Sequence, residues 1–555
     1  MVYDYIIVGA GSAGCILASR LSEDGRYTVL LLEAGGKDDS FWFRIPVGYA
    51  KSYYNPAVNW MYSTEPEKEL DGRRIYVPRG KVQGGSGSIN AMIFVRGAAT
   101  DFDDWAAAGN PGWGADDVLP YFRRLETHAQ GASEWHGGDG PIHVTPMRGA
   151  THPVSDAFLA ACGELGLPAN DDFNGAAIEG AGIYDINTRR GQRSHSSAEY
   201  LRPALTRPNL AIERKAYAQR LLHAADGSRV EGVEVLQEGS LRTFRARREV
   251  ILAAGAVGSP KLLQLSGIGD GAALSTHGIG VRRHLPAVGR NLQDHLCASF
   301  YYRANRPTLN GTFASLFGQA RLGLQYVLTR KGPFAMSVNQ AGGFFRGSPV
   351  EKRPNIQLYF NPLSYRIPND PKAGLKPEPY PGFLIAFNSC RPTSRGEIVI
   401  ASGDPSAAPL IRPNFLSTDH DVNEALQGSR LVRRIASAPA LAAVTEEEVS
   451  PSPAADSDGK LLDYFRANSG SIYHLCGTCA MGPDVGSAVV DARLRVHGVE
   501  GLRVVDASIF PNVTAGNINA PTMMVAEKGA AMILEDARQN GSGKVRNDFA
   551  SEAVD

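Results

Sequence analysis

Three glycines near the start of the chain, Gly9, Gly11 and Gly14, have the G-x-G-x-x-G spacing of a dinucleotide-binding turn. Gly9 permits the tight turn, Gly11 lets the backbone approach a pyrophosphate, and Gly14 lets the following helix pack closely on the preceding strand. Glu33 closes the next apolar strand, where its carboxylate can accept hydrogen bonds from an adenosine ribose. The pattern predicts a bound dinucleotide and redox chemistry, with NAD and FAD as open alternatives.

A second glycine-rich segment, residues 78–90, has the sequence PRGKVQGGSGSIN. Apolar residues flank it at Ile75, at Val77 and over 91–95, so we expect a loop held between buried elements rather than a solvent-exposed linker. Its backbone N–H groups can cradle a pyrophosphate, and its small side chains permit close approach to a flat ring system. This segment is therefore a second candidate contact for the dinucleotide.

The candidate reactive groups stand near the other end of the chain. His474 lies in the sequence SIYHLCGT, and Asn517 lies in TAGNINAPT just before the last long helix. An imidazole is suited to accept a proton near neutral pH, although a single histidine is more often structural and the Asn-x-Asn-x-Pro run is also explained as a helix cap. Cys476 and Cys479 have C-x-x-C spacing, but they lack a second ligand pair or a thioredoxin-like context, so we expect two cysteines in a tight glycine turn.

Distant parts of the chain must supply the elements that position these groups. Residues 5–8 and 29–32 are predicted parallel strands, with a helix beginning near Ser12 between them. Residues 248–255 and 502–506 are further short apolar strands, each followed by a helix-like segment with a proline near its start. We therefore expect one Rossmann-like sheet assembled from separate segments.

The expected fold class is α/β, in two domains of α+β type: a Rossmann-like cofactor domain that is discontinuous in sequence, and a substrate domain with an antiparallel sheet flanked by helices. The first domain is assigned residues 1–155, 200–295 and 475–538. Residues 156–199 and 296–474 are richer in turns and in alternating patterns, such as that of residues 396–400, and form the second domain. The polar stretch 539–555 is expected to be a mobile tail.

The composition is that of an ordinary folded enzyme, with 43% hydrophobic and 21% charged residues in 555. The 57 basic and 57 acidic side chains cancel, which gives no electrostatic reason to expect nucleic acid or an anionic membrane as a partner. No apolar stretch approaches the roughly 20 residues needed to span a bilayer, and no signal-like segment precedes the first strand. We expect a cytoplasmic protein without a transmembrane segment, whose six scattered cysteines are reduced.

Five motifs follow one another in a fixed order: the glycine turn with Glu33, RGKxxGGSxSIN at 79–90, GAxxSPxLLxLSGIG at 255–269, VGxNLQDH at 288–295, and the segments around His474 and Asn517. Together they resemble the glucose–methanol–choline (GMC) oxidoreductase family, and in pattern its bacterial choline-dehydrogenase-like and alcohol-dehydrogenase-like members. The resemblance extends from Tyr3 to about Leu534. It implies FAD as the cofactor and the oxidation of an alcohol to a carbonyl compound.

The resemblance also implies roles for single residues. His474 stands at the position of the family's active-site base, and Asn517 at that of the partner that hydrogen-bonds the substrate oxygen. Tyr473 and Asn339 are candidate substrate contacts, although packing explains each of them at least as well. The helix starting about Pro521 would place its positive end near N1 and C2=O of reduced flavin. The residues predicted to bind the cofactor are Gly9, Gly11, Ser12, Ala13, Gly14, Glu33, Ala34, Trp60, Arg79, Gly80, Gly84, Gly85, Ser86, Asn90, Ala91, Ala218, Gly255, Asp506, Ala507, Asn519 and Pro521.

Several positions depart from the family pattern. Some members attach FAD covalently through a histidine of the glycine-rich loop, but the matching position here is Ile89, so non-covalent FAD is expected. Leu475 stands where many relatives have proline, Ala480 where a basic residue is common, and Gln83 and Gly87 also differ. These changes lie near the cofactor and the reactive histidine. Transfer of any particular relative's substrate is therefore weakened, and no aromatic or carboxylate cage for choline can be assigned.

The expected function is FAD-dependent oxidation of a primary alcohol to the aldehyde, by proton abstraction and hydride transfer to flavin N5, with electrons passed to a quinone or another non-oxygen acceptor. An oxidase that converts O2 to hydrogen peroxide is the close alternative. A non-redox flavoprotein, such as a lyase or a binding module, is an alternative of another class. An NAD-dependent dehydrogenase would leave residues 79–90 and the C-terminal motifs unexplained. The expected partners are the alcohol and the electron acceptor, not nucleic acid, and no metal site is expected.

Overall fold

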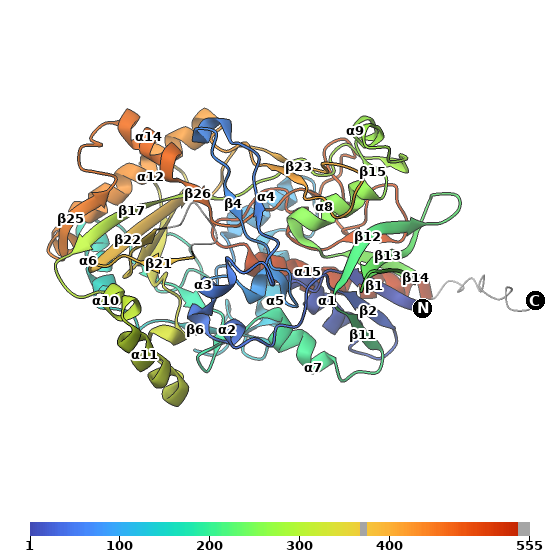
Figure 1. Cartoon of the computed structure of the whole chain (residues 1–555), viewed down its shortest axis with the longest axis horizontal. Coiled ribbons are helices and arrows are strands. Elements are labelled where there is room, and N and C mark those ends of the chain that lie inside the picture. Colours follow the sequence, from blue (N-terminus) through green and yellow to red (C-terminus); the bar gives the residue numbers. More distant parts are fainter. Residues whose placement is uncertain (367–373, 542–555) are drawn as a thin grey trace, which may run out of the picture.

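The structure of the protein is a computed structural model that describes residues 1–366 and 374–541. Within these residues the chain forms two halves, each built around a sheet of seven strands (Figure 1). The half at the right of Figure 1 contains the first strands of the chain, and the half at the left contains most of the middle of the chain. Both halves contribute to the candidate site.

The first sheet has the order β11-β2-β1-β14-β13-β12, with β27 beside β14. Its strands are β1 Val2–Val8, β2 Val29–Leu32, β11 Leu210–Glu213, β12 Ala216–His223, β13 Val230–Gln237, β14 Ser240–Leu252 and β27 Leu502–Val504. The strand β1 pairs in parallel with β2 and β14, and β14 pairs in parallel with β27, as expected for a Rossmann-like sheet assembled from separate segments. The first half of β14 instead forms an antiparallel hairpin with β13.

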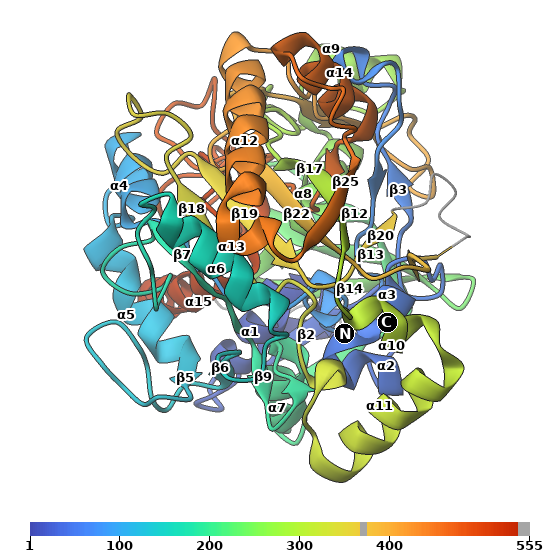
Figure 2. The same ribbon diagram turned by 90° about the vertical axis from the view of Figure 1, so that its left-hand side faces the viewer.

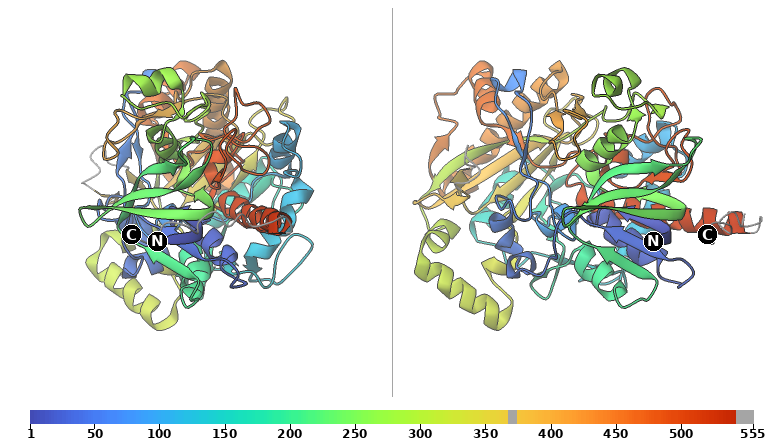
Figure 3. Two further views of the ribbon diagram at one scale, coloured as in Figure 1. Left: turned by 90° about the vertical axis from the view of Figure 1, so that its right-hand side faces the viewer. Right: turned by 45° about the vertical axis from the view of Figure 1, so that its right-hand side comes forward.

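Continuous burial explains why the central strand β1 is apolar without alternation. Its last four residues, Tyr5 to Val8, are all at most 4% exposed, because layers cover both faces of the sheet. The helix α1 Ser12–Leu21 packs against α15 Asn519–Gly541 on one side. Figure 3 views the molecule from the side of this half and shows the green strands β12 to β14 together with the red helix α15.

The second sheet is antiparallel throughout and has the order β25-β17-β22-β19-β18-β7, with β26 beside β17. Its strands are β7 Gly180–Ile183, β17 Leu296–Ala304, β18 Ala341–Phe345, β19 Ile356–Asn361, β22 Gly382–Ser389, β25 Thr445–Ser450 and β26 Gly470–Ser471. The helices α6 Val154–Glu164, α12 Asp419–Ser437 and α14 Asp458–Asn468 cover its outer face (Figure 2). The other face is therefore turned toward the first half. We propose that the two sheets mark two domains with the boundaries given above.

Two details differ from the sequence-based expectations. Residues 396–400 do not join the large antiparallel sheet: β23 Glu397–Val399 pairs with β24 Leu410–Arg412 in a separate two-stranded sheet. Ile398 is buried with Val257. The alternating pattern therefore predicts a half-buried strand, but it does not identify the sheet to which the strand belongs. Residues 539–541 of the predicted tail belong instead to α15, which continues to Gly541, and the remainder of that segment lies outside the described residues.

The remaining elements lie in the connections between these strands. The helices are α2 Phe41–Arg44, α3 Tyr49–Ser52, α4 Ala99–Ala107, α5 Ala115–Leu125, α7 Arg202–Ala204, α8 Gly255–Leu265, α9 Gly271–Thr276, α10 Leu309–Ala314, α11 Leu316–Thr329 and α13 Pro439–Ala442. The short strands are β3 Tyr62–Ser63, β4 Tyr76–Val77, β5 Glu126–His128, β6 Ile142–Pro146, β8 Asp185–Ile186, β9 Thr188–Arg189, β10 Gln192–Arg193, β15 Ile268–Gly269, β16 Arg283–His284, β20 Tyr365–Arg366 and β21 Lys376–Pro377. None of the helices in the described part of the chain is both long enough and apolar enough to cross a bilayer.

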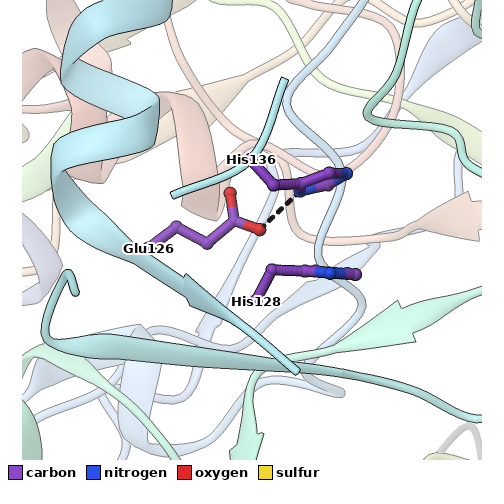
Figure 4. A group of neighbouring side chains, drawn as sticks. All are labelled: Glu126, His128 and His136. Carbon is purple, nitrogen blue, oxygen red and sulfur yellow. Dashed lines mark hydrogen bonds and ion pairs between the residues drawn. The ribbon is translucent and has the colours of Figure 1, made fainter. Parts of the chain in front are cut away.

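A buried cluster of charged side chains lies outside the two seven-stranded sheets (Figure 4). Glu126, His128 and His136 are close enough to share a metal ion, but His136 already places Nδ1 2.8 Å from Glu126 and Nε2 2.9 Å from Asp172. Arg96 forms an ion pair with the same Glu126 carboxylate. Burial lowers the pKa of His136, but hydrogen bonds to the two carboxylates outweigh it and raise that pKa to about 9. We therefore interpret the cluster as an ion-pair network.

Candidate active site

One elongated cavity between the two halves gathers residues from the glycine-rich segments and from the C-terminal motifs. The predicted residues that line it are Gly9, Gly11, Ser12, Ala13, Glu33, Ala34, Trp60, Arg79, Gly80, Gly85, Ser86, Asn90, Ala91, Ala218, Gly255, Tyr473, His474, Asp506, Ala507, Asn517 and Asn519. Four other predicted residues, Gly14, Gly84, Asn339 and Pro521, are not among the cavity residues. Motifs more than four hundred positions apart in the sequence thus meet in one space.

The first glycine turn joins β1 to α1 at one end of the cavity. Gly9 has a φ of 103°, and a Cβ atom there would lie 2.5 Å from the Ala253 carbonyl oxygen. The helix α1 begins after Gly11 without a side-chain cap, so the amides of its first turn remain available to an anion. Gly14 has a packing role instead, because a Cβ atom there would lie 1.8 Å from the Gly9 carbonyl oxygen.

The second glycine segment lies directly against the first. A Cβ atom on Gly85 would lie 2.7 Å from Cα of Gly11, and Gly85 also has a left-handed φ of 54°. The neighbouring Gly84 donates its N–H to the Ala10 carbonyl at 2.7 Å, which explains its place behind the cavity wall. Only glycine permits this backbone-to-backbone contact, because any side chain would separate the two segments.

A buried arginine fixes the end of this second segment. Arg193 donates to the side chain of Asn90 at 2.6 Å and to its carbonyl oxygen at 2.7 Å. A further contact of 3.3 Å joins Arg193 to the carbonyl oxygen of Gly87. Arg193 was not identified from the sequence, because it lies outside every recognised motif.

Glu33 occupies the far end of the cavity, just after β2. Its carboxylate accepts hydrogen bonds from the backbone N–H groups of Ala10, at 3.0 Å, and Gly35, at 2.7 Å. Burial raises the pKa of Glu33 to about 7 despite these bonds. Each carboxylate oxygen can accept more than one hydrogen bond, so the contact with an adenosine ribose stays a prediction.

The middle of the cavity is also bordered by helix beginnings. Asp506 accepts hydrogen bonds from the N–H of Gly255 at 2.8 Å and from the hydroxyl of Ser259 at 2.6 Å, at the start of α8. Ser12 donates to the Asn519 side chain at 2.7 Å, which joins the N-terminal ends of α1 and α15. Uncapped amides, glycines without room for a side chain and two converging helix N-termini suit an elongated dinucleotide with a negative centre. The residues present therefore fit FAD.

The reactive end of the cavity is held by a buried carboxylate. The backbone N–H of His474 donates to Asp294 at 2.7 Å, and Ser471 forms a short hydrogen bond to the same side chain. Tyr473, between them, has a φ of 73°, a conformation that costs energy for any residue except glycine, and Arg79 donates to its carbonyl oxygen at 2.7 Å. This strained turn directs the His474 imidazole into the cavity.

A chain of hydrogen bonds fixes the tautomer of that imidazole. His295 Nε2 lies 3.1 Å from the Cys390 carbonyl oxygen, which accepts hydrogen bonds only, so this nitrogen carries the proton. In neutral His295, Nδ1 is then an acceptor, and His474 Nδ1, 2.8 Å away, must be the donor. The Nε2 atom of His474 is left with a lone pair, 3.2 Å from the Asn517 amide nitrogen. His474 is thus set up as a proton acceptor.

The surroundings keep both imidazoles neutral. Burial, the adjacent His295 and the Arg79 guanidinium hold the pKa of His474 well below its ordinary value. Burial lowers the pKa of His295 to about 4. The pKa is lowered because His474 is buried, with 8% of its surface exposed, and burial disfavours the charged form. His474 is unprotonated at neutral pH.

Aromatic and apolar side chains surround the reactive end. Tyr53 and Tyr473 meet edge to face with their ring centroids 5.5 Å apart, and Met92 and Ile93 also line the cavity. Asn339, a predicted substrate contact, lies instead with its side-chain oxygen 2.6 Å from the Asn361 amide. The acidic residues among the cavity liners are Glu33 and Asp506, and both accept backbone N–H groups.

His295 and Asp294 are important residues of the site that were assigned no role from the motifs alone. They end the VGxNLQDH motif, so a signal was present. Their partners, His474 and Ser471, follow roughly 180 positions later, and a side-chain contact over that separation has no periodic signature. The pairing of β17 with β26 and the bridge between Gln293 and Cys476 bring the two segments together.

The chain is similar to known oxidoreductases over nearly its whole length. Two GMC oxidoreductase family models match it, one over residues 3–297 and the other over residues 392–526. It is 42% identical over 535 residues to an oxygen-dependent choline dehydrogenase of Vibrio vulnificus, which covers 96% of this chain and 94% of the relative. It is 41% identical over 540 residues to the mitochondrial choline dehydrogenase of Mus musculus, covering 96% and 89% of the two chains.

Solved structures agree with this relationship. The crystal structure of a pyridoxine 4-oxidase from Mesorbium loti has a TM-score of 0.86 at 31% identity, over 98% of this chain and all of that chain. A formate oxidase has a TM-score of 0.90 at 27% identity, over 97% and 99%.

The cofactor and the type of donor follow from these findings. GMC oxidoreductases are FAD-binding flavoproteins, and Ile89, which lines the cavity and is 2% exposed, offers no nucleophile for a covalent flavin bond. The predicted relationship, the two-part α/β fold and non-covalent FAD are therefore confirmed. The chain belongs to the GMC oxidoreductase family and is an FAD-dependent oxidoreductase that acts on CH–OH donors.

Proposed function

We propose that this enzyme oxidises a neutral primary alcohol to the aldehyde, with His474 as the general base and a non-oxygen electron acceptor. The observation that carries the proposal is the lone pair on His474 Nε2, fixed by the hydrogen bonds through His295 to the Cys390 carbonyl and facing the cavity. A base held neutral in a nearly dry site can take a hydroxyl proton without first losing one of its own.

In the proposed reaction, His474 Nε2 accepts the hydroxyl proton while Nδ1–H keeps its hydrogen bond to His295. The amide nitrogen of Asn517 donates to the same Nε2 in the structure; when the substrate hydroxyl takes its place on Nε2, this amide donates to the substrate oxygen and so orients the carbinol carbon. The Arg79 guanidinium lowers the pKa of His474 and favours negative charge on the substrate oxygen for the same electrostatic reason. FAD, when bound, accepts the hydride from the carbinol carbon.

The charge distribution favours a neutral alcohol over choline. Both acidic cavity residues, Glu33 and Asp506, are engaged by backbone N–H groups near the helix and strand ends that would hold the nucleotide. The described surroundings of His474 combine the cation of Arg79 with the rings of Tyr53 and Tyr473, which line the cavity, while the Asp294 carboxylate lies behind the cavity wall and accepts the His474 N–H. A quaternary ammonium group gains cation–π contacts from such rings but meets the repulsion of the guanidinium. Relatives are named choline dehydrogenases, so choline is the substrate to test against.

The nature of the acceptor rests on the relatives. The enzymes that are 41–42% identical are named dehydrogenases, whereas the pyridoxine 4-oxidase and the formate oxidase are 31% and 27% identical. This difference supports a dehydrogenase, although one group of relatives is called oxygen-dependent. Oxidase activity is the second candidate for the same site.

Two measurements test the proposal. Anaerobic addition of 1-octanol, benzyl alcohol or choline should bleach the flavin absorbance with the neutral alcohols at least about tenfold faster than with choline. Aerobic turnover should depend on an added acceptor such as phenazine methosulfate and release little peroxide. A flavin that none of a broad alcohol panel reduces would argue for a non-redox flavoprotein, faster reduction by choline would overturn the substrate assignment, and stoichiometric peroxide without an acceptor would establish an oxidase.

A further inference from the structure

The helix α11, Leu316–Thr329, exposes more large apolar side chains than any other helix in the described part of the chain. Leu316 is 84% exposed, Phe317 81%, Leu328 73%, Leu324 62% and Val327 57%. Scattered single apolar residues on a surface need no explanation, but five on one helix of a folded enzyme form a patch of the kind that marks an interaction site.

The exposed apolar residues occupy the face of α11 that points directly away from the protein. At about 100° per residue, they fall within roughly one third of the helix circumference. The buried residues Gly318, Leu322 and Tyr326 occupy a narrow stripe on the opposite side. The stripe attaches α11 to the body, and the tyrosine hydroxyl donates to the Gly191 carbonyl at 2.9 Å. The outer face therefore has no partner among the described residues.

A second pair of exposed aromatic side chains lies on a nearby helix. Gly191, which accepts the hydrogen bond from α11, lies between β9 and β10, and α2 packs against β10. On α2 the rings of Phe41 and Trp42 are 54% and 42% exposed and meet edge to face. Figures 1 and 2 show α2 and α11 along the same lower border of the molecule. We call these seven apolar residues of α2 and α11 the apolar border.

The charged residues on and beside α11 are basic. Residues 295–350 contain no aspartate and no glutamate. Four exposed cationic residues lie in or beside α10 and α11, and none of them forms an ion pair with another described residue: Arg306, Arg321, Arg330 and Lys331. The zero net charge of the whole chain hides this local excess, which is the reason that bulk composition gave no indication of an anionic partner.

We propose that the apolar border docks the enzyme on the surface of an anionic lipid bilayer. An amphipathic helix with leucine and aromatic side chains on one face and basic residues beside it lies in the headgroup region of such a bilayer. A second copy of the chain fits less well, because pairing two such faces would bring Arg321, Arg330 and Lys331 of both copies together without an acidic counterpart. The docking does not depend on the chemistry at His474.

Vesicle sedimentation with the FAD-loaded enzyme tests the proposal. The enzyme should pellet with vesicles of phosphatidylcholine and phosphatidylglycerol, and much less with phosphatidylcholine alone. The triple variant Phe317→Ser, Leu324→Ser, Leu328→Ser should partition at least about tenfold more weakly. The triple variant Arg321→Gln, Arg330→Gln, Lys331→Gln should lose the preference for phosphatidylglycerol and the sensitivity to salt.

A matched control removes exposed apolar residues elsewhere. Leu241 and Val281 are 59% and 43% exposed on the first half, and the double variant Leu241→Ser, Val281→Ser should pellet like the original enzyme. FAD content and alcohol oxidation with a soluble acceptor should be unchanged in all variants, which shows that they fold. Failure of the original enzyme to bind anionic vesicles, or equal binding by the apolar triple variant, would overturn the proposal. A dimer in light scattering that the apolar triple variant abolishes would assign the border to a second copy instead.

Discussion

The two ends of the cavity are constructed differently. At the end near Glu33 the walls are mostly backbone: glycines of two segments touch each other, and amide groups supply the polar contacts. At the other end, side chains do the work, since His474, His295 and Asn517 form one hydrogen-bonded chain. The closely packed backbone at the Glu33 end leaves no room for an added side-chain atom. At the other end, the function depends on which nitrogen of each imidazole carries the proton.

This difference predicts two separable kinds of failure. Adding a methyl group to the backbone-built end should weaken FAD binding while the chemistry of any bound flavin stays intact. Changing a side chain at the reactive end should leave FAD bound but slow its reduction. The following predictions test whether the two ends can be separated in this way, in order of decreasing effect.

Replacement of the base should have the largest effect. In His474→Ala the hydroxyl proton has no acceptor, so the rate of anaerobic flavin reduction by the best alcohol should fall by roughly 10²- to 10⁴-fold. The variant should keep its FAD, because the glycine-built end is unchanged. Stopped-flow absorbance of the flavin gives the rate. The exposed His284→Ala serves as the control, and an enzyme little slowed by the His474 change would refute the general-base role.

A methyl group at the contact between the two glycine segments should weaken FAD binding. In Gly85→Ala the new Cβ atom would meet Cα of Gly11 at 2.7 Å in a left-handed conformation, a strain of about 1–3 kcal/mol. The FAD dissociation constant should rise by roughly tenfold or more, measured by flavin fluorescence on dilution. Gly36→Ala is the matched control, because a Cβ atom at Gly36 would meet nothing within 4 Å. Unchanged FAD affinity in Gly85→Ala would contradict the backbone-built description.

The same difference explains what the sequence could predict. The turn from Gly9 to Gly14 is local: spacing alone specifies it, because each glycine acts on neighbours within a few residues of chain. The two-sheet fold also followed from apolar strands and ordered motifs. The sheet that contains residues 396–400 did not follow, because alternation shows that a strand is half buried without naming its partner strand.

The reactive end was only partly predictable for the same reason. His474 and Asn517 were identified through the family resemblance. Which nitrogen of His474 carries the proton, however, depends on His295 and on the Cys390 carbonyl, which come from other parts of the chain. The lowered pKa of His474 depends on burial, which no local pattern reports. The apolar border and the basic residues beside it were missed because the composition averages them with the rest of the surface.

Removal of the tautomer-fixing partner should give a smaller effect than removal of the base. In His295→Leu the Nδ1–H of His474 loses its acceptor, a loss worth about 1–2 kcal/mol, so flavin reduction should slow by roughly tenfold. Because His295 is a positioning residue, the pH profile should also change, with the apparent pKa of the base moving. The change should appear in kcat with little effect on KM. A reduced rate with an unchanged pH profile would indicate a merely structural role.

The smallest expected effect is the response of the unaltered enzyme to acid. A base is active when unprotonated, so lowering its pKa moves the loss of activity to lower pH. An imidazole with an ordinary pKa of about 6.5 would be roughly nine-tenths protonated at pH 5.5 and would lose most of its activity there. Burial, His295 and Arg79 hold the pKa of His474 well below that value, so protonation of His474 should change kcat/KM by less than about twofold between pH 7.5 and pH 5.5. Burial raises the pKa of Asp294, which accepts the His474 N–H, to about 6, so this carboxyl group also titrates in the window and the profile is measured in Asp294→Asn as well. A steep loss near pH 6.5 that persists in Asp294→Asn, measured by initial rates while FAD remains bound, would mean that water enters the reactive end and that its chemistry depends less on side-chain enclosure than the structure indicates.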